Sequence, residues 1–129
     1  MFRTLGWINA ALLLIVLLPW LGTRLNKLAF SGKNKGLQSF VRAMRKVHKP
    51  AGVLLVILAY VHGTMALGSL RLHTGTILFF AALVTAIFGA AFWQIKKRGI
   101  FTVHKALALL TALLFLFHWL IPGALRNLM

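Results

Sequence analysis

Four apolar stretches divide this 129-residue chain, and they constrain its fold more than any other feature. They cover approximately residues 6–22, 50–68, 74–95 and 102–121. A helix rises about 1.5 Å per residue, so roughly 20 apolar residues cross the hydrocarbon core of a bilayer. The chain is 60% hydrophobic, with a mean hydropathy of +0.89. The sequence therefore predicts an all-α fold in one domain over residues 1–129, an integral membrane four-helix bundle.

The first apolar stretch has an alternative interpretation as a secretory signal peptide, because Arg3 precedes it. A signal peptide ends in small residues at its cleavage site. This stretch ends instead in Pro19, Trp20 and Leu21, with the charged Arg24 shortly after them. We therefore expect the first stretch to be retained as a membrane span.

The residues before the second stretch predict an amphipathic helical lead-in that begins near residue 37. Its apolar side chains recur at helical spacing: Leu37, Phe40, Val41, Met44 and Val47. Pro50 either starts the membrane helix or kinks one continuous helix. Because the apolar stripe continues to His48, we favour the kinked continuous helix. In the fourth stretch, Thr102 is the expected N-cap.

Lysine and arginine residues are concentrated in two of the three connections between the apolar stretches. Eight lie between the first and second stretches, and four lie between the third stretch and the start of the fourth. These twelve are Arg24, Lys27, Lys33, Lys35, Arg42, Arg45, Lys46, Lys49, Lys96, Lys97, Arg98 and Lys105. Only Arg3, Arg71 and Arg126 lie on the opposite side. The positive-inside rule then predicts cytoplasmic connections and both termini outside, in a prokaryotic inner membrane.

The residue types that are missing restrict the chemistry of the chain. It has no cysteine, which excludes iron–sulfur clusters and thiolate ligands, and no Asp or Glu, which excludes carboxylate acid–base catalysis and carboxylate metal sites. The formal net charge is +15. In a chain this hydrophobic, that charge favours contact with anionic membrane lipids and with redox partner subunits of acidic surface. A nucleic-acid partner is not expected.

Two pairs of histidines share the spacing His-x13-His, His48 with His62 and His104 with His118. Each pair begins with the tripeptide Val-His-Lys. The spacing equals two heptads, so both histidines of a pair face the same way, about 21 Å apart along the helix axis. A single membrane histidine often only hydrogen-bonds a neighbouring helix. That role does not explain equal spacing on two helices that run in the same direction, so a functional site is favoured.

Two imidazoles at each membrane level favour haem over zinc, because a zinc site needs three or four converging protein ligands. Pairing His48 with His104 predicts one haem b near the cytoplasmic face, and pairing His62 with His118 predicts a second near the outer face. Both haems would lie between the second and fourth helices. A bis-histidine haem has no open coordination position, so its task is one-electron transfer.

Glycines and cations near the histidines are further candidate cofactor-binding residues. Gly75 and Gly89 in the third stretch repeat the two-heptad spacing, so each is expected at the level of one haem. Their alternative role is close helix packing. The other candidates are Gly52 and Gly63 beside the second-stretch histidines and, for haem propionates, Arg45, Lys49 and Lys105 inside and Arg71 and His73 outside. For the lysines and arginines, contact with lipid headgroups is the alternative.

These spacings resemble those of membrane di-haem cytochromes b. The two His-x13-His stretches and the Gly-x13-Gly stretch are similar to the four-helix haem core of cytochrome b in quinol–cytochrome c reductases. The His-Lys pair at the start of each ligand helix is similar to ferric-reductase and NADPH-oxidase-like transmembrane domains. The resemblance covers residues 6–122 and implies that the axial ligands are His48, His104, His62 and His118. The chain departs from these families in lacking a Pro-Glu-Trp-Tyr quinol-oxidation motif, a flavin or nucleotide domain, and a glycine partner for Gly6.

The expected function is transmembrane electron transfer through two b-type haems, by the membrane cytochrome subunit of a larger oxidoreductase complex. The chain has no expected catalytic residue, so a self-sufficient enzyme is not favoured. Quinol is a candidate electron donor, and a bound quinone is a further hypothesis. Two alternatives stay open: a quinone-linked membrane reductase that acts alone, and a non-redox basic membrane anchor or scaffold whose histidines only pack helices.

Overall fold

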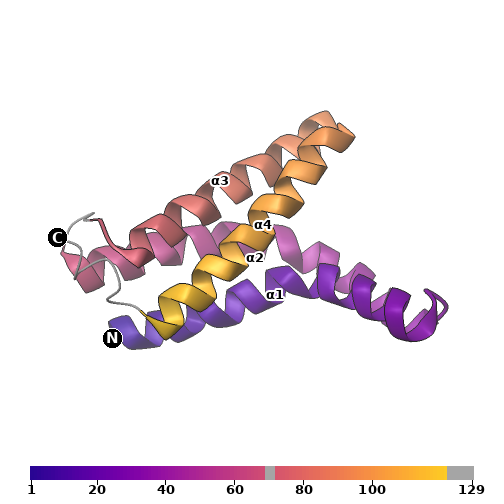
Figure 1. Cartoon of the computed structure of the whole chain (residues 1–129), viewed down its shortest axis with the longest axis horizontal. Coiled ribbons are helices and arrows are strands. Elements are labelled where there is room, and N and C mark those ends of the chain that lie inside the picture. Colours follow the sequence, from indigo (N-terminus) through magenta and orange to yellow (C-terminus); the bar gives the residue numbers. More distant parts are fainter. Residues whose placement is uncertain (69–71, 122–129) are drawn as a thin grey trace. The chain divides into compact units, whose positions relative to one another are not determined.

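The computed structural model describes residues 1–68 and 72–121, which form four helices without strands (Figure 1). The helices are α1 (Phe2–Phe30), α2 (Lys35–Leu67), α3 (Thr74–Ile95) and α4 (Arg98–Leu120). Each is long and apolar enough to cross a membrane. The all-α fold class and the four apolar helices are thus confirmed.

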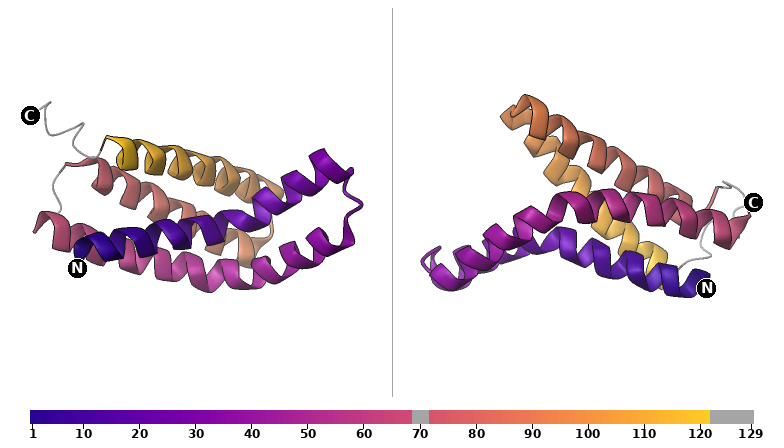
Figure 2. Two further views of the ribbon diagram at one scale, coloured as in Figure 1. Left: turned by 90° about the horizontal axis from the view of Figure 1, so that it is seen from below. Right: turned by 180° about the vertical axis from the view of Figure 1, so that it is seen from behind.

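The four helices belong to two compact units, and α2 contributes to both. The first unit, over residues 3–57, contains α1 and the first part of α2. The second unit runs from Leu58 and contains the rest of α2 with α3 and α4. Each unit is built around neighbouring antiparallel helices, α1 with α2 and α3 with α4 (Figure 2).

The helix α1 is longer than the apolar stretch that predicts it, because its polar continuation is also helical. It passes through Pro19 and ends at Phe30, eight residues beyond Gly22. Within this continuation the Thr23 hydroxyl donates to the Pro19 carbonyl of the preceding turn (2.7 Å). Ser31 then adopts a left-handed conformation (φ 51°), and its N–H donates to the Asn26 carbonyl to close the helix.

The helix α2 is one continuous helix of 33 residues that contains Pro50. It begins at Lys35, two residues before the expected lead-in. A proline inside a helix removes one backbone hydrogen bond and crowds the carbonyl four residues earlier. The turns on both sides of Pro50 remain helical, so the amphipathic segment and the apolar segment belong to one helix.

The connection between α3 and α4 is a two-residue turn. Lys96 adopts a left-handed conformation (φ 55°) and its N–H donates to the Phe92 carbonyl, while Lys97 is extended and caps α4. The expectation that Thr102 caps α4 is wrong, since the helix already begins at Arg98. The Thr102 hydroxyl donates to the Arg98 carbonyl within the first turn (3.1 Å), which is how threonine is accommodated inside a helix.

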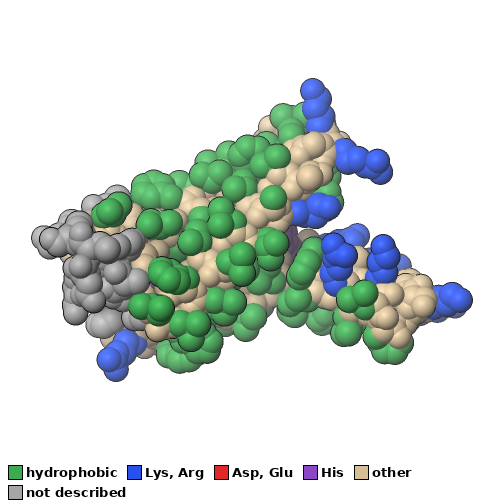
Figure 3. Space-filling view, viewed as in Figure 1, with side chains coloured by type: hydrophobic (Ala, Val, Ile, Leu, Met, Phe, Trp, Pro, Cys, Tyr) green, Lys and Arg blue, Asp and Glu red, His purple; other side chains and the backbone are tan. Residues whose placement is uncertain are grey.

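Large apolar side chains cover the helix surfaces (Figure 3). Leu28 is 82% exposed and Leu120 is 74% exposed, whereas only Leu12, Leu13, Val41 and Ala51 form a buried apolar core among the described residues. Water disfavours so much exposed apolar surface, and a lipid bilayer does not. These surfaces support an integral membrane protein.

Candidate functional site

The glycines of α3 and the histidines of α4 meet at two levels of the α3–α4 pair. A Cβ atom placed on Gly75 would lie 3.2 Å from Cε1 of His118, and one placed on Gly89 would lie 3.0 Å from Cε1 of His104. Because α3 and α4 are antiparallel, a step of two heptads forward on α3 matches two heptads back on α4. The Gly-x13-Gly and His-x13-His spacings are therefore parts of one contact pattern.

The imidazole of His104 is oriented by the backbone of α3. Its Nδ1 lies 2.9 Å from the carbonyl oxygen of Thr85. A carbonyl oxygen only accepts, so Nδ1 carries the hydrogen and, in the neutral ring, Nε2 carries the lone pair. Metal-binding histidines in proteins commonly have this arrangement, with the second ring nitrogen donating to a carbonyl.

His48 has the same arrangement in the other unit. Its Nδ1 lies 2.8 Å from the carbonyl oxygen of Val16 in α1, so His48 also has the tautomer with the lone pair on Nε2. The two Val-His-Lys histidines thus share a partner type, a backbone carbonyl from the preceding helix. The sequence could not predict which backbone carbonyl accepts from each histidine, because every residue has a carbonyl.

His118 at the other end of α4 has a side-chain partner instead. Its Nδ1 lies 2.8 Å from the hydroxyl of Thr74, which is buried at the start of α3. Either atom can donate in this pair, so the hydrogen bond orients the ring without fixing its tautomer. Thr74 was not among the candidates, although its position next to Gly75 places it at the same level.

His62 and His73 lie near His118 in the second unit. Both imidazoles are close enough to interact electrostatically with that of His118. The His73 ring meets the His118 ring edge-on at a centroid distance of 6.0 Å. His73 also caps α3, because its Nδ1 accepts from the Gly75 N–H (3.3 Å). His73 and His118 are therefore in ring contact at this end of the unit, and His62 lies within electrostatic range of His118.

Two hydroxyls, those of Thr85 and the buried Thr111, lie between the two histidine levels. Thr111, seven residues from each α4 histidine, is 4% exposed, and its hydroxyl lies 2.9 Å from that of Thr85. Each hydroxyl also bonds a carbonyl of its own helix, that of Ala81 for Thr85 and that of Leu107 for Thr111. This pair fixes the α3–α4 register midway between the glycine–histidine contacts. It was not anticipated, since isolated threonines in apolar stretches carry no distinctive pattern.

The remaining candidates lie in more open surroundings. Among the described residues, no heavy atom lies within 4 Å of a Cβ placed on Gly52 or Gly63, so neither glycine makes a close helix contact. Lys105 extends over the ring of Phe101, with Nζ 4.9 Å from its centroid. Lys49 is exposed and Arg45 borders a cavity in the first unit. Arg71 lies outside the described residues.

In residues 1–68 and 72–121, no group of three or more histidines is arranged to hold a metal ion, as a zinc site would require. No family model, no characterised protein and no solved structure matches the chain. The resemblance to di-haem cytochromes b therefore depends on the residues of the chain itself.

Proposed function

We propose that the chain conducts electrons across a membrane through two b-type haems, as the membrane cytochrome subunit of a larger redox complex. His48 and His104 would hold one haem, and His62 and His118 the other. The observation that carries the proposal is the contact of Gly89 with His104 and of Gly75 with His118, repeated at the same two-heptad spacing.

The glycines of α3 let the rings of His104 and His118 lie close against the helix backbone. At each level the histidine ring lies where a Cβ on the glycine would crowd it, so the imidazole meets the backbone of α3 rather than a side chain. Alanine at either position would bring a Cβ to 3.2 Å or 3.0 Å from the ring, which is tighter than an ordinary contact. The recurrence of this contact at both levels supports two equivalent ligand positions on α4.

The hydrogen bonds of the inner histidines fit the same role. Because Nδ1 donates to the Val16 carbonyl in His48 and to the Thr85 carbonyl in His104, the lone pair of each neutral ring is on Nε2. The same hydrogen bond holds each ring plane in place and raises the basicity of the ligand nitrogen. Both effects would favour binding of haem iron by Nε2.

A haem held by two of these imidazoles would supply one-electron transfer. The chain's own residues supply the ligand nitrogens, the apolar spans that exclude water, and the cations at one side of the membrane. The absence of Asp and Glu leaves no carboxylate to accept protons from a quinol within the chain. Donor and acceptor sites are therefore assigned to partner subunits.

The test is a reduced-minus-oxidised absorption spectrum of the purified chain, together with the haem-to-protein ratio. We expect a b-type α-band and a ratio of about two haems per chain, one for each histidine pair. Absence of the α-band would favour the non-redox anchor. A ratio near one would refute the two-haem assignment.

A further inference from the structure

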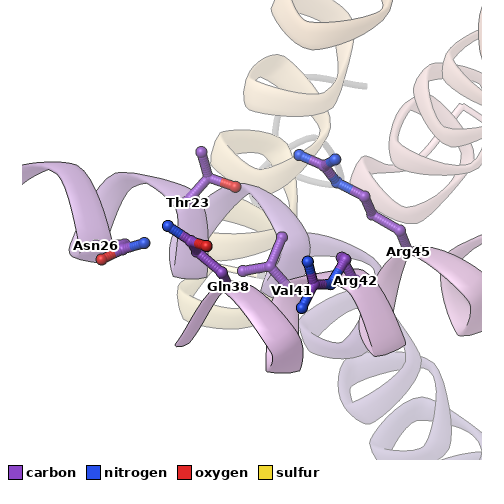
Figure 4. Close-up of a pocket in the computed structure, with 6 residues that line it drawn as sticks. All are labelled: Thr23, Asn26, Gln38, Val41, Arg42 and Arg45. Carbon is purple, nitrogen blue, oxygen red and sulfur yellow. The ribbon is translucent and has the colours of Figure 1, made fainter. Parts of the chain in front are cut away.

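A cavity of about 180 Å³ lies between α1 and α2 in the first unit, on the side of the connecting turn. The residues that line it come only from these two helices (Figure 4): Thr23, Asn26, Gln38, Val41, Arg42 and Arg45. One water molecule needs about 10–15 Å³ of such space, so the cavity has room for a tetrahedral anion. The proposed electron transfer does not use it.

The uncharged lining residues Asn26, Gln38 and Val41 are fixed in place by contacts within the first unit. Asn26 is 6% exposed, and its amide oxygen accepts from the Asn34 N–H (3.1 Å). Gln38 donates to the Gly32 carbonyl (2.7 Å), and Val41 is one of the buried apolar residues. The cavity therefore exists before any ligand enters, which lowers the cost of ordering the site on binding.

The charged wall consists of Arg42 and Arg45, which lie three positions apart and so on one face of α2. The chain contains no Asp or Glu, so no acidic side chain of its own is present to neutralise these guanidinium groups. Both arginines line the cavity, and a guanidinium group can donate two parallel hydrogen bonds to the oxygens of a phosphate. The natural occupant is an anion that comes from outside the chain.

The depth of the cavity in the membrane is indicated by Trp20, one turn before Thr23. Trp20 is 44% exposed, and the Arg24 guanidinium carbon lies 5.7 Å from the centre of its ring. Exposed tryptophan with an adjacent cation is typical of the membrane–water interface, where headgroups lie. We propose that this cavity binds the phosphate group of an anionic phospholipid, with Arg42 and Arg45 as its donors.

The test measures lipid binding to the full chain in detergent by native mass spectrometry, with phosphatidylglycerol and phosphatidylcholine as probes. We expect preferential retention of phosphatidylglycerol. The variant Arg42→Gln/Arg45→Gln should bind it about tenfold more weakly, as the loss of hydrogen bonds to a charged group implies. The matched control Lys33→Gln/Lys35→Gln removes the same charge at the connection between α1 and α2, outside the cavity lining, and its affinity should change less than about twofold.

Competition with inorganic phosphate shows whether the bound phosphate group belongs to a lipid headgroup or is a free ion. Millimolar phosphate should not displace the lipid from the wild-type chain, because the acyl chains add apolar binding that the free ion lacks. Complete displacement would overturn the lipid assignment in favour of free phosphate. An equal loss in both double variants, or no preference for phosphatidylglycerol, would overturn the site itself.

A conservative variant keeps the test interpretable if the glutamine variant misfolds. Arg42→Lys/Arg45→Lys keeps the charge but loses the bidentate donors, so we expect binding several-fold weaker than wild type. Unchanged binding by this variant would overturn the role of the guanidinium groups. Helical content by circular dichroism reports folding in every variant independently of haem content.

Discussion

The Cε1 atom of His104 lies 3.0 Å from the point where a side chain on Gly89 would begin. Contacts this short are rare for real Cβ atoms, so the His104 ring occupies room that only glycine leaves. The contact of His118 with Gly75 repeats this relationship at 3.2 Å. The two levels of the α3–α4 pair therefore share one geometry, and a change at one level can be tested against the other.

Replacing Gly89 with valine should displace the His104 ring. The added side chain overlaps the ring, and overpacking of this kind costs about 1–3 kcal/mol. On the proposed function, the variant keeps the outer haem and loses the inner one, which halves the haem-to-protein ratio. The ratio is measured from absorbance of the purified protein.

The control for this experiment is Gly99→Val in α4. A Cβ on Gly99 meets no heavy atom of the described residues within 4 Å, so the same substitution adds no overlap. This variant should keep the wild-type haem content. Equal haem loss in both variants would show that valine acts through helix propensity and not through contact with His104.

Replacing His62 with alanine should remove the outer haem while the inner haem keeps its absorption spectrum. The reason is that His62 and His118 form the outer ligand pair of the proposal, while His48 and His104 are held separately by backbone carbonyls. Difference spectra of the variant measure this directly.

The comparison variant for His62→Ala is His73→Asn. Asparagine is a good N-cap, so the start of α3 is preserved while the third outer imidazole is removed. Both haems should remain in this variant. Loss of the outer haem from His73→Asn together with its retention in His62→Ala would assign the ligand role to His73.

Gly22 of α1 lies in close contact with α2 in the first unit. A Cβ on Gly22 would lie 2.7 Å from Cγ2 of the buried Val41, so Gly22→Ala should lower the free energy of unfolding by about 1–3 kcal/mol. Unfolding in detergent, followed by circular dichroism, measures this loss. Val41→Ala in the same chain should recover part of the loss, and purely additive effects of the two substitutions would contradict direct contact.

The absence of cysteine allows the expected orientation to be tested with single-cysteine variants. A membrane-impermeant maleimide should label Leu72→Cys in intact spheroplasts, since Leu72 is 63% exposed in the turn before α3. Lys33→Cys lies in the basic connection that the positive-inside rule assigns to the cytoplasm, so it should react only after lysis. The reverse labelling pattern would refute the orientation.

Much of the fold is predictable because it depends on composition along the chain. Four apolar stretches predict four helices, and the apolar stripe from Leu37 indicates that α2 continues through Pro50. Helix ends are harder to predict, as Thr102 and the extension of α1 to Phe30 illustrate. Where a helix ends depends on whether the following residues are capped and hydrogen-bonded, and the apolar content of a stretch does not predict this.

The sequence by itself determined the number of long apolar helices, the spacing of the histidines and glycines, and the absence of acidic residues. These are properties of single stretches, because helical period and hydrophobicity act along one segment. Only the tertiary structure decided that Gly89 meets His104, that Thr85 and Thr111 meet between the histidine levels, and that carbonyls of Val16 and Thr85 accept from the inner histidines. Such contacts depend on the register of two helices. Every residue has a backbone carbonyl, so the residue types do not identify the carbonyl that accepts a hydrogen bond.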